Sequence, residues 1–184
     1  MAELYRYLTS TLTAVTFFPL AGVLAILLIN KERKDLIRWV AVGAALLTFV
    51  FSLFMLAQFN PIDPGVQLVV RVPWIQLGST LRIDYHLGLD GLSVLLVLLT
   101  TLLTPIAMFS AWTAIEERVK EFMIFFLLLE VGMTGVFLAL DLFLFYIFWE
   151  FTLVPMYFLI GIWGGERRIY AAIKFFLYTM AGSI

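Results

Sequence analysis

The sequence predicts an all-α polytopic membrane protein with about six transmembrane helices and a candidate β-hairpin in one outer loop. Of its 184 residues, 63% are hydrophobic and only 14% are charged, whereas a soluble domain is nearer half apolar. Several apolar runs reach the roughly 20 residues that an α-helix needs to span a bilayer. The charged residues gather mainly in short connectors between these runs.

The first two spans are expected at residues 12–30 and 36–59, with the charged stretch KERKDLIR between them. Pro19 lies inside the first span, where membrane helices tolerate proline. The one long connector follows at residues 60–88, and its prolines and glycines are typical of a break between helices. Within it, VQLVVRV and TLRIDYH alternate enough to predict a β-hairpin on the membrane surface.

Four further spans are expected at residues 89–115, 122–140, 142–163 and from about 169 to the last residue. Asp141 stands between two of them, where it can cap the helix that follows. The last span has about 16 residues, too few to cross a bilayer comfortably, so we expect a fragment of a longer protein. We divide the chain into residues 1–88, with two spans and the hairpin, and residues 89–184, with spans three to six.

Positive charge in the connectors predicts the orientation. Nine lysines and arginines fall on one side of the predicted membrane and three on the other: Lys31, Arg33, Lys34, Arg38, Arg118, Lys120, Arg167, Arg168 and Lys174 against Arg6, Arg71 and Arg82. We therefore expect the N-terminus and the hairpin outside. The connectors after the first, third and fifth spans are expected on the cytoplasmic side of a bacterial plasma membrane, or on the matrix or stromal side of an organellar membrane.

Three ionisable residues fall inside the predicted spans and are the candidate functional residues: Glu130, Glu150 and Lys174. A charge at mid-bilayer costs on the order of 3 kcal/mol, so such residues normally face a bundle interior or water. From the helical rise, they lie roughly 12, 20 and 7 Å from the cytoplasmic surface, respectively. A contact between Glu130 and Lys174 is therefore feasible if their helices are neighbours, whereas Glu150 and Lys174 would need a bridging group.

Glu150 shares one stripe of its helix with Tyr146, Tyr157 and Gly161, which makes a polar seam in an apolar segment. These observations predict a proton relay of Glu150, Lys174 and Glu130. The alternative is structural: a protonated glutamate hydrogen-bonded between helices, or a lysine that extends its ammonium group to the membrane surface.

Composition excludes several other classes of site. The chain has no cysteine and one histidine, His86, so neither a thiolate iron–sulfur site nor a bis-histidine haem can form within it. WGGERR lacks the spacing of a phosphate-binding loop and is expected to be a helix-ending turn. A net charge of −1 without a basic patch gives no basis for nucleic-acid binding.

Two long segments resemble the antiporter-like subunit M of proton-pumping NADH:quinone oxidoreductase, respiratory complex I. They are YHLGLDGLSVLLVLLT, residues 85–100, and GVFLALDLFLFYIFWEFTLVPMYFLIGIWGGERRIYAAIKFFLYTMAGS, residues 135–183; the acidic LLLEVGM is similar as well. The resemblance is close over residues 80–184 and loose over the first two spans. It implies the first third of a subunit with roughly 14 helices, in which residues 89–184 begin the antiporter-like repeat.

The resemblance implies that Glu150, in FWE, belongs to a proton channel, with Lys174, in KFF, as its neighbour. The family pairs this glutamate with a lysine on a later, broken helix that these residues do not include. The implied function is proton translocation driven by quinone reduction elsewhere in the complex, with no redox chemistry and no cofactor or metal in this chain. The implied partners are other membrane subunits of complex I, and lipids.

Two alternatives stay open. A subunit of a multi-subunit cation/proton antiporter, or of a membrane-bound hydrogenase, shares the glutamate of the fifth span. A structural membrane scaffold is of another class, and it predicts that Glu150 and Glu130 tolerate substitution.

Overall fold

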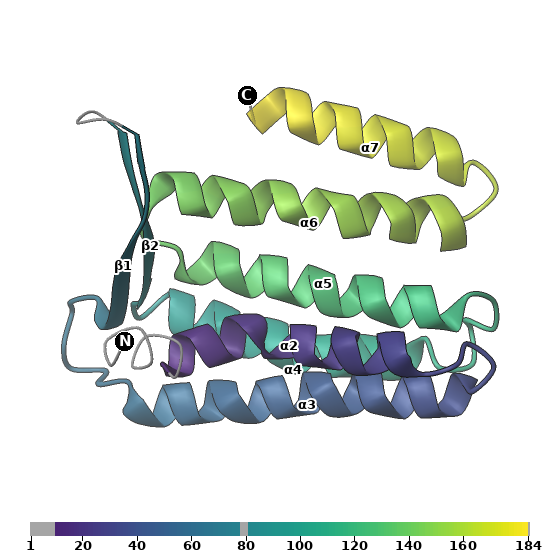
Figure 1. Ribbon diagram of the computed structural model, residues 1–184, viewed down its shortest axis with the longest axis horizontal. Helices are drawn as coiled ribbons and strands as arrows, with labels where there is room; N and C mark the ends of the chain where they lie inside the picture. The colour runs from purple at the N-terminus through teal and green to yellow at the C-terminus, as the bar shows by residue number, and fades with distance from the viewer. Residues whose placement is uncertain (1–9, 78–80, 184) are drawn as a thin grey trace.

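The computed structural model describes residues 10–77 and 81–183, where helices lie side by side and a β-hairpin crosses one end (Figure 1). The helices are α2 (Thr11–Leu28), α3 (Lys34–Gln58), α4 (Ser93–Ser110), α5 (Val119–Leu138), α6 (Leu142–Trp163) and α7 (Arg168–Ser183). Five of them, α2 to α6, are long and apolar enough to cross a membrane, and α7 has 16 residues. The predicted all-α polytopic fold is confirmed.

The predicted hairpin is also confirmed. Strands β1 (Gln67–Leu77) and β2 (Leu81–Leu89) pair antiparallel, with irregular register between Gln67 and Val70 and between Pro73 and Ile75. Proline cannot donate to a strand ladder, so its position beside a register shift is the one that a hairpin tolerates.

The third helix is shorter than the sequence predicts. It begins at Ser93 rather than residue 89, because Leu89 pairs with Gln67 at the end of the hairpin. The Asp90 carboxylate then accepts the backbone N–H groups of Leu92 (3.0 Å) and Ser93 (2.7 Å), which stabilises the start of α4. The helix ends at Ser110, before a turn through residues 111–114.

The helices α2 to α5 form a bundle, with α2 and α4 each packed against both α3 and α5. Gly22 of α2 marks a close approach between helices, because a Cβ atom there would lie 2.5 Å from the Ala44 Cβ of α3 and 3.0 Å from Leu127 of α5. Small residues at such positions let membrane helices approach closely. The helix α6 packs on α5, and α7 packs on α6 (Figure 1).

The hairpin is fastened to the α5–α6 connection. The Leu140 N–H donates to the His86 carbonyl oxygen at 2.9 Å. Asp141 caps α6, as predicted, by accepting the N–H groups of Phe143 (2.9 Å) and Leu144 (3.1 Å). Its second oxygen accepts the Asp84 N–H of β2 at 3.3 Å. The hairpin therefore fixes the start of the helix that carries Glu150.

At the other end of the bundle, lysine and arginine side chains bind backbone carbonyl groups of neighbouring connectors. The Lys120 ammonium group donates to the carbonyls of Leu27 (2.9 Å) and Ile29 (2.7 Å), at the C-terminus of α2. Lys34 donates to Glu116 (2.7 Å) in the same way. Cations at helix C-termini satisfy orphan carbonyls and complement the helix dipole.

Candidate functional site

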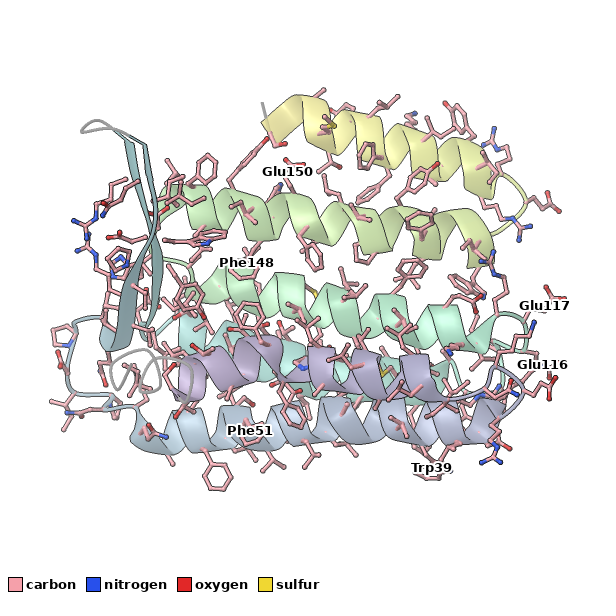
Figure 2. All side chains as sticks on the ribbon, viewed as in Figure 1. Trp39, Phe51, Glu116, Glu117, Phe148 and Glu150 are labelled. Atoms are coloured by element: carbon pink, nitrogen blue, oxygen red, sulfur yellow. The ribbon has the colours of Figure 1, made fainter. Side chains whose placement is uncertain are left out.

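Glu150 lies in the middle of α6, is half-buried, and points toward α7 (Figure 2). One carboxylate oxygen accepts a hydrogen bond of 2.6 Å from the Ser183 hydroxyl group. The same hydroxyl oxygen lies 3.0 Å from the Met180 carbonyl oxygen, which is a second acceptor for its hydrogen. No sequence pattern predicts this pair, because Ser183 lies 33 residues away on another helix.

The stripe of α6 that contains Glu150, Tyr157 and Gly161 faces α7. Tyr157 packs edge-on against Phe176, with ring centroids 5.7 Å apart. A Cβ atom at Gly161 would lie 3.5 Å from the Ala172 Cβ atom, an ordinary contact. Tyr146 lines a cavity of about 510 Å³ together with Ser183. The polar seam therefore faces a neighbouring helix at the α6–α7 contact.

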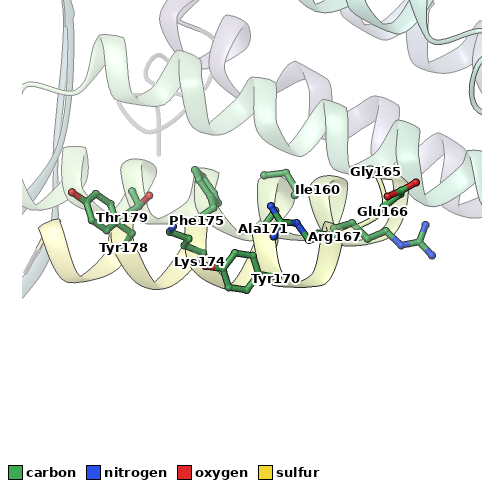
Figure 3. A pocket seen from close by; sticks show the side chains of 12 residues that line it. Ile160, Gly165, Glu166, Arg167, Tyr170, Ala171, Lys174, Phe175, Tyr178 and Thr179 are labelled. Atoms are coloured by element: carbon green, nitrogen blue, oxygen red, sulfur yellow. The ribbon is translucent and has the colours of Figure 1, made fainter.

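Lys174 is exposed and points away from this seam. It precedes Ser183 by nine residues, which places it about 180° around the helix. Its Nζ atom lies 5.7 Å from the centroid of the Tyr170 ring. Figure 3 shows it in the first half of α7, beside Tyr170. With Arg167 and Tyr170, it lines an open cavity of about 640 Å³. The structure does not bring Lys174 into direct contact with Glu150.

Glu130 is fully buried, at 0% exposure. Neither carboxylate oxygen has a hydrogen-bond partner among the described residues. Gly132 and Gly135 of the same helix face α6, because Cβ atoms there would meet Thr152 and Phe148. At about 100° per residue, that face lies roughly 140–200° from Glu130. Glu130 therefore points into the bundle of α2, α3 and α4.

The condition for a contact between Glu130 and Lys174, that their helices are neighbours, is not met. Their helices are not neighbours, because α6 packs between α5 and α7 (Figure 1). Within residues 10–77 and 81–183, no ion pair includes Glu130, Glu150 or Lys174. Glu150 also points away from α5, so the two carboxylates lie on opposite sides of the α5–α6 contact. Their shared role in a relay stays a prediction.

A cluster of two ion pairs, which was not predicted from the sequence, lies on the hairpin. The buried Asp84 carboxylate accepts hydrogen bonds from Arg71 (2.7 Å) and Arg82 (2.9 Å). The bonds from Arg82 and then Arg71 hold the pKa of Asp84 below its ordinary value. The signal was present in TLRIDYH, because residues two apart on a strand share a face. These ion pairs link β1 to β2 beside the Asp84 backbone N–H group, which donates to the Asp141 carboxylate.

Apolar spans with carboxylates on helix contact faces define a polytopic membrane protein that places ionisable groups inside the membrane. Residues 139–184 match the family model described as NADH:quinone oxidoreductase/Mrp antiporter, TM. The chain is 49% identical over 179 residues to NADH-quinone oxidoreductase subunit M of Rhodobacter capsulatus, covering 94% of this chain and 33% of the relative. It is 39% identical over 176 residues to NADH-ubiquinone oxidoreductase chain 4 of Marchantia polymorpha, covering 95% and 35%.

Solved structures share the fold of this chain. Respiratory complex I from Thermus thermophilus with bound NADH contains a chain with a TM-score of 0.76 and 28% identity, matched over 94% of this chain and 33% of that one. The archaeal membrane-bound sulfane sulfur reductase shares the fold, with a TM-score of 0.72, 19% identity and coverage of 94% and 26%. The chain spans about a third of the length of these curated relatives. The comparisons confirm its resemblance to the antiporter-like subunit M of complex I.

Proposed function

We propose that this chain is part of a proton-translocating membrane subunit of NADH:quinone oxidoreductase, in which Glu150 binds and releases the transported proton. The observation that carries the proposal is a half-buried, mid-span carboxylate with a hydroxyl donor at 2.6 Å on the next helix. Relatives named as subunit M and chain 4 of the oxidoreductase support the same assignment. The energy comes from quinone reduction by other subunits, and the proposal places no cofactor in this chain.

Ser183 gives Glu150 a way to exchange a proton without leaving a polar group unpaired. When Glu150 is ionised, the Ser183 hydroxyl group donates to its carboxylate. When Glu150 is protonated, the acid donates to the Ser183 oxygen, and the Ser183 hydrogen turns to the Met180 carbonyl, 3.0 Å away. Each state keeps its hydrogen bonds satisfied, which lowers the cost of a buried group that changes charge.

Lys174 is proposed to act at the cytoplasmic entrance to this path rather than beside Glu150. It lies near the inner end of α7, in a cavity that it shares with Arg167 and Arg168. This assignment depends on the orientation from charge bias, with the N-terminus outside. A cysteine introduced into EERVKE, residues 116–121, should then react with an impermeant reagent only from the cytoplasmic side; labelling from outside reverses the orientation.

The central test is Glu150→Gln in the full-length protein, assembled in its complex. Quinone-linked proton pumping into vesicles is expected to fall to background, because glutamine cannot release a proton. Glu32→Gln, at an exposed turn position away from this path, is the matched control and should pump normally. Assembly and electron transfer are measured on the same membranes. Pumping by Glu150→Gln at the wild-type level would sink the proposal.

A cation/proton antiporter subunit is the second candidate, because the matching family model covers both kinds of protein. The two differ in their dependence on sodium. Transport that requires sodium, and continues without NADH or quinone, would favour the antiporter. A structural scaffold predicts instead that Glu150→Gln changes neither assembly nor transport.

A further inference from the structure

The bundle of α2 to α5 contains buried threonines near the level of Glu130. Thr16 of α2, Thr48 of α3 and Thr134 of α5 are all at 0% exposure. Their level follows from the contact of Gly22 with Ala44 and Leu127. Counting residues from that contact toward the hairpin along each helix places Thr16 and Thr48 within about one helical turn of the level of Glu130.

Each of the three hydroxyl groups donates its hydrogen atom to a backbone carbonyl of its own helix. Thr16 donates to the Leu12 carbonyl (2.9 Å), Thr48 donates to the Ala44 carbonyl (3.0 Å), and Thr134 donates to the Glu130 carbonyl (2.8 Å). A hydroxyl group has one hydrogen, so each can now only accept. Protein hydroxyl groups at this level therefore offer Glu130 acceptors and no donors.

Pro19 adds one more acceptor. It lies inside α2 and has no N–H group, so it leaves the Val15 carbonyl without its usual helical donor. Val15 is fully buried and lies on the same face of α2 as Gly22, about 20° away around the helix. An ionised Glu130, which is also only an acceptor, would thus lie near acceptors in an apolar bundle.

We infer that α2 to α5 enclose a water-binding site in which Glu130 is held as a neutral carboxylic acid. The acid O–H group donates to the acceptors at this level, directly or through water, and a bound water molecule donates to the acid carbonyl oxygen. Buried waters in proteins typically bridge such otherwise unpaired polar groups. A sodium ion would suit acceptors as well, but it needs the charged carboxylate and several more oxygen ligands.

This site is separate from Glu150 and does not depend on the proposed transport function. Glu130 faces α2 to α4, whereas Glu150 faces α7. Between them, Phe148 and Thr152 of α6 pack on Gly135 and Gly132 of α5.

The test is infrared difference spectroscopy of the full-length protein in lipid vesicles at neutral pH. Wild type should show the C=O stretching band of a carboxylic acid, which ionised carboxylates lack. Glu130→Gln should lose this band, and the control Glu150→Gln should keep it. An O–H stretching band that shifts in oxygen-labelled water should disappear in Glu130→Leu. Loss of a carboxylate band instead of an acid band in Glu130→Gln would overturn the inference.

Two conservative variants keep the inference testable if Glu130 variants do not fold. Thr16→Val and Thr48→Val each remove one acceptor at nearly constant volume, and at least one should shift the acid band without abolishing it. An unchanged band in both variants contradicts the site. Replacement of potassium by sodium at constant ionic strength should leave the acid band in place, and its disappearance in sodium would identify a cation site instead.

Discussion

The contact between α5 and α6 depends on the absence of a side chain at Gly135, and Gly135→Ala tests this. A Cβ atom there would lie 2.5 Å from the Phe148 Cε1 atom and against other atoms of the same ring. Phe148 is only 6% exposed, and its ring lies near that of Phe17, with ring centroids 6.2 Å apart. Both rings line a cavity of about 720 Å³. An added methyl group therefore either turns the ring into that cavity or separates the helices, and both changes disturb the packing of α6 on α5.

The expected loss of stability follows from two opposing effects. Overpacking of a well-packed contact costs about 1–3 kcal/mol. Replacing glycine by alanine inside a helix returns about 0.5–1 kcal/mol. We expect Gly135→Ala to be less stable than wild type by about 1–2 kcal/mol, and to pump protons more slowly, because Phe148 is two residues from Glu150.

The assay is unfolding of the full-length protein in one detergent, monitored by circular dichroism. Gly43→Ala is the matched control, since nothing lies within 4 Å of a Cβ atom at Gly43 in α3, and it should be at least as stable as wild type. Combining Gly135→Ala with Phe148→Leu should cost less than the sum of the single changes, with a coupling of about 0.5–3 kcal/mol. Additive losses, or a Gly135→Ala protein as stable as the control, would refute the steric argument.

Two further predictions concern the end of the bundle that the hairpin crosses. Asp141→Ala removes the cap of α6 and the acceptor of the Asp84 N–H, so the unfolding free energy should fall by about 0.5–2 kcal/mol; Asp141→Asn should retain most of it, and equal losses in both variants would contradict capping. Arg82 and Arg71 lower the pKa of Asp84 in the folded state. The contribution of Asp84 to the free energy of unfolding is therefore present above its unfolded pKa, near 3.8, and is lost as the pH falls through its folded pKa. Unfolding measured across this acid range should show that loss in wild type and not in Asp84→Asn, and parallel curves would exclude the ion pairs as its cause.

The sequence predicted helix positions well where local chemistry marks the ends. The predicted fifth span, residues 142–163, coincides with α6 (Leu142–Trp163), because Asp141 caps its start and two glycines follow its end. The third span was overextended, because apolar residues after the hairpin suit either a strand or a helix. Leu89 belongs to β2 through pairing with Gln67, and such pairing between distant residues leaves no local signal.

Site contacts were harder to predict than site residues. Helical spacing correctly grouped Glu150 with Tyr157, but it cannot identify the neighbouring helix that this face meets. That depends on the order α5, α6, α7, and this order turns Lys174 away from the seam and brings Ser183 to it. Glu130 was found by its charge, whereas the three buried threonines near its level are unremarkable in sequence.

The packing order also explains why two similar glutamates have different surroundings. Helix α5 contacts α2, α3, α4 and α6, and 56% of its 18-residue apolar stretch is buried. Helix α6 contacts α5, α7 and the hairpin, and only 22% of the corresponding stretch is buried. A carboxylate on α5 is therefore enclosed unless it faces α6, and glycines occupy that face. A carboxylate on the outer face of α6 meets only α7, where a serine can donate to it and a cavity lies alongside. Proton exchange on the timescale of transport thus suits Glu150, and a permanently bound proton suits Glu130.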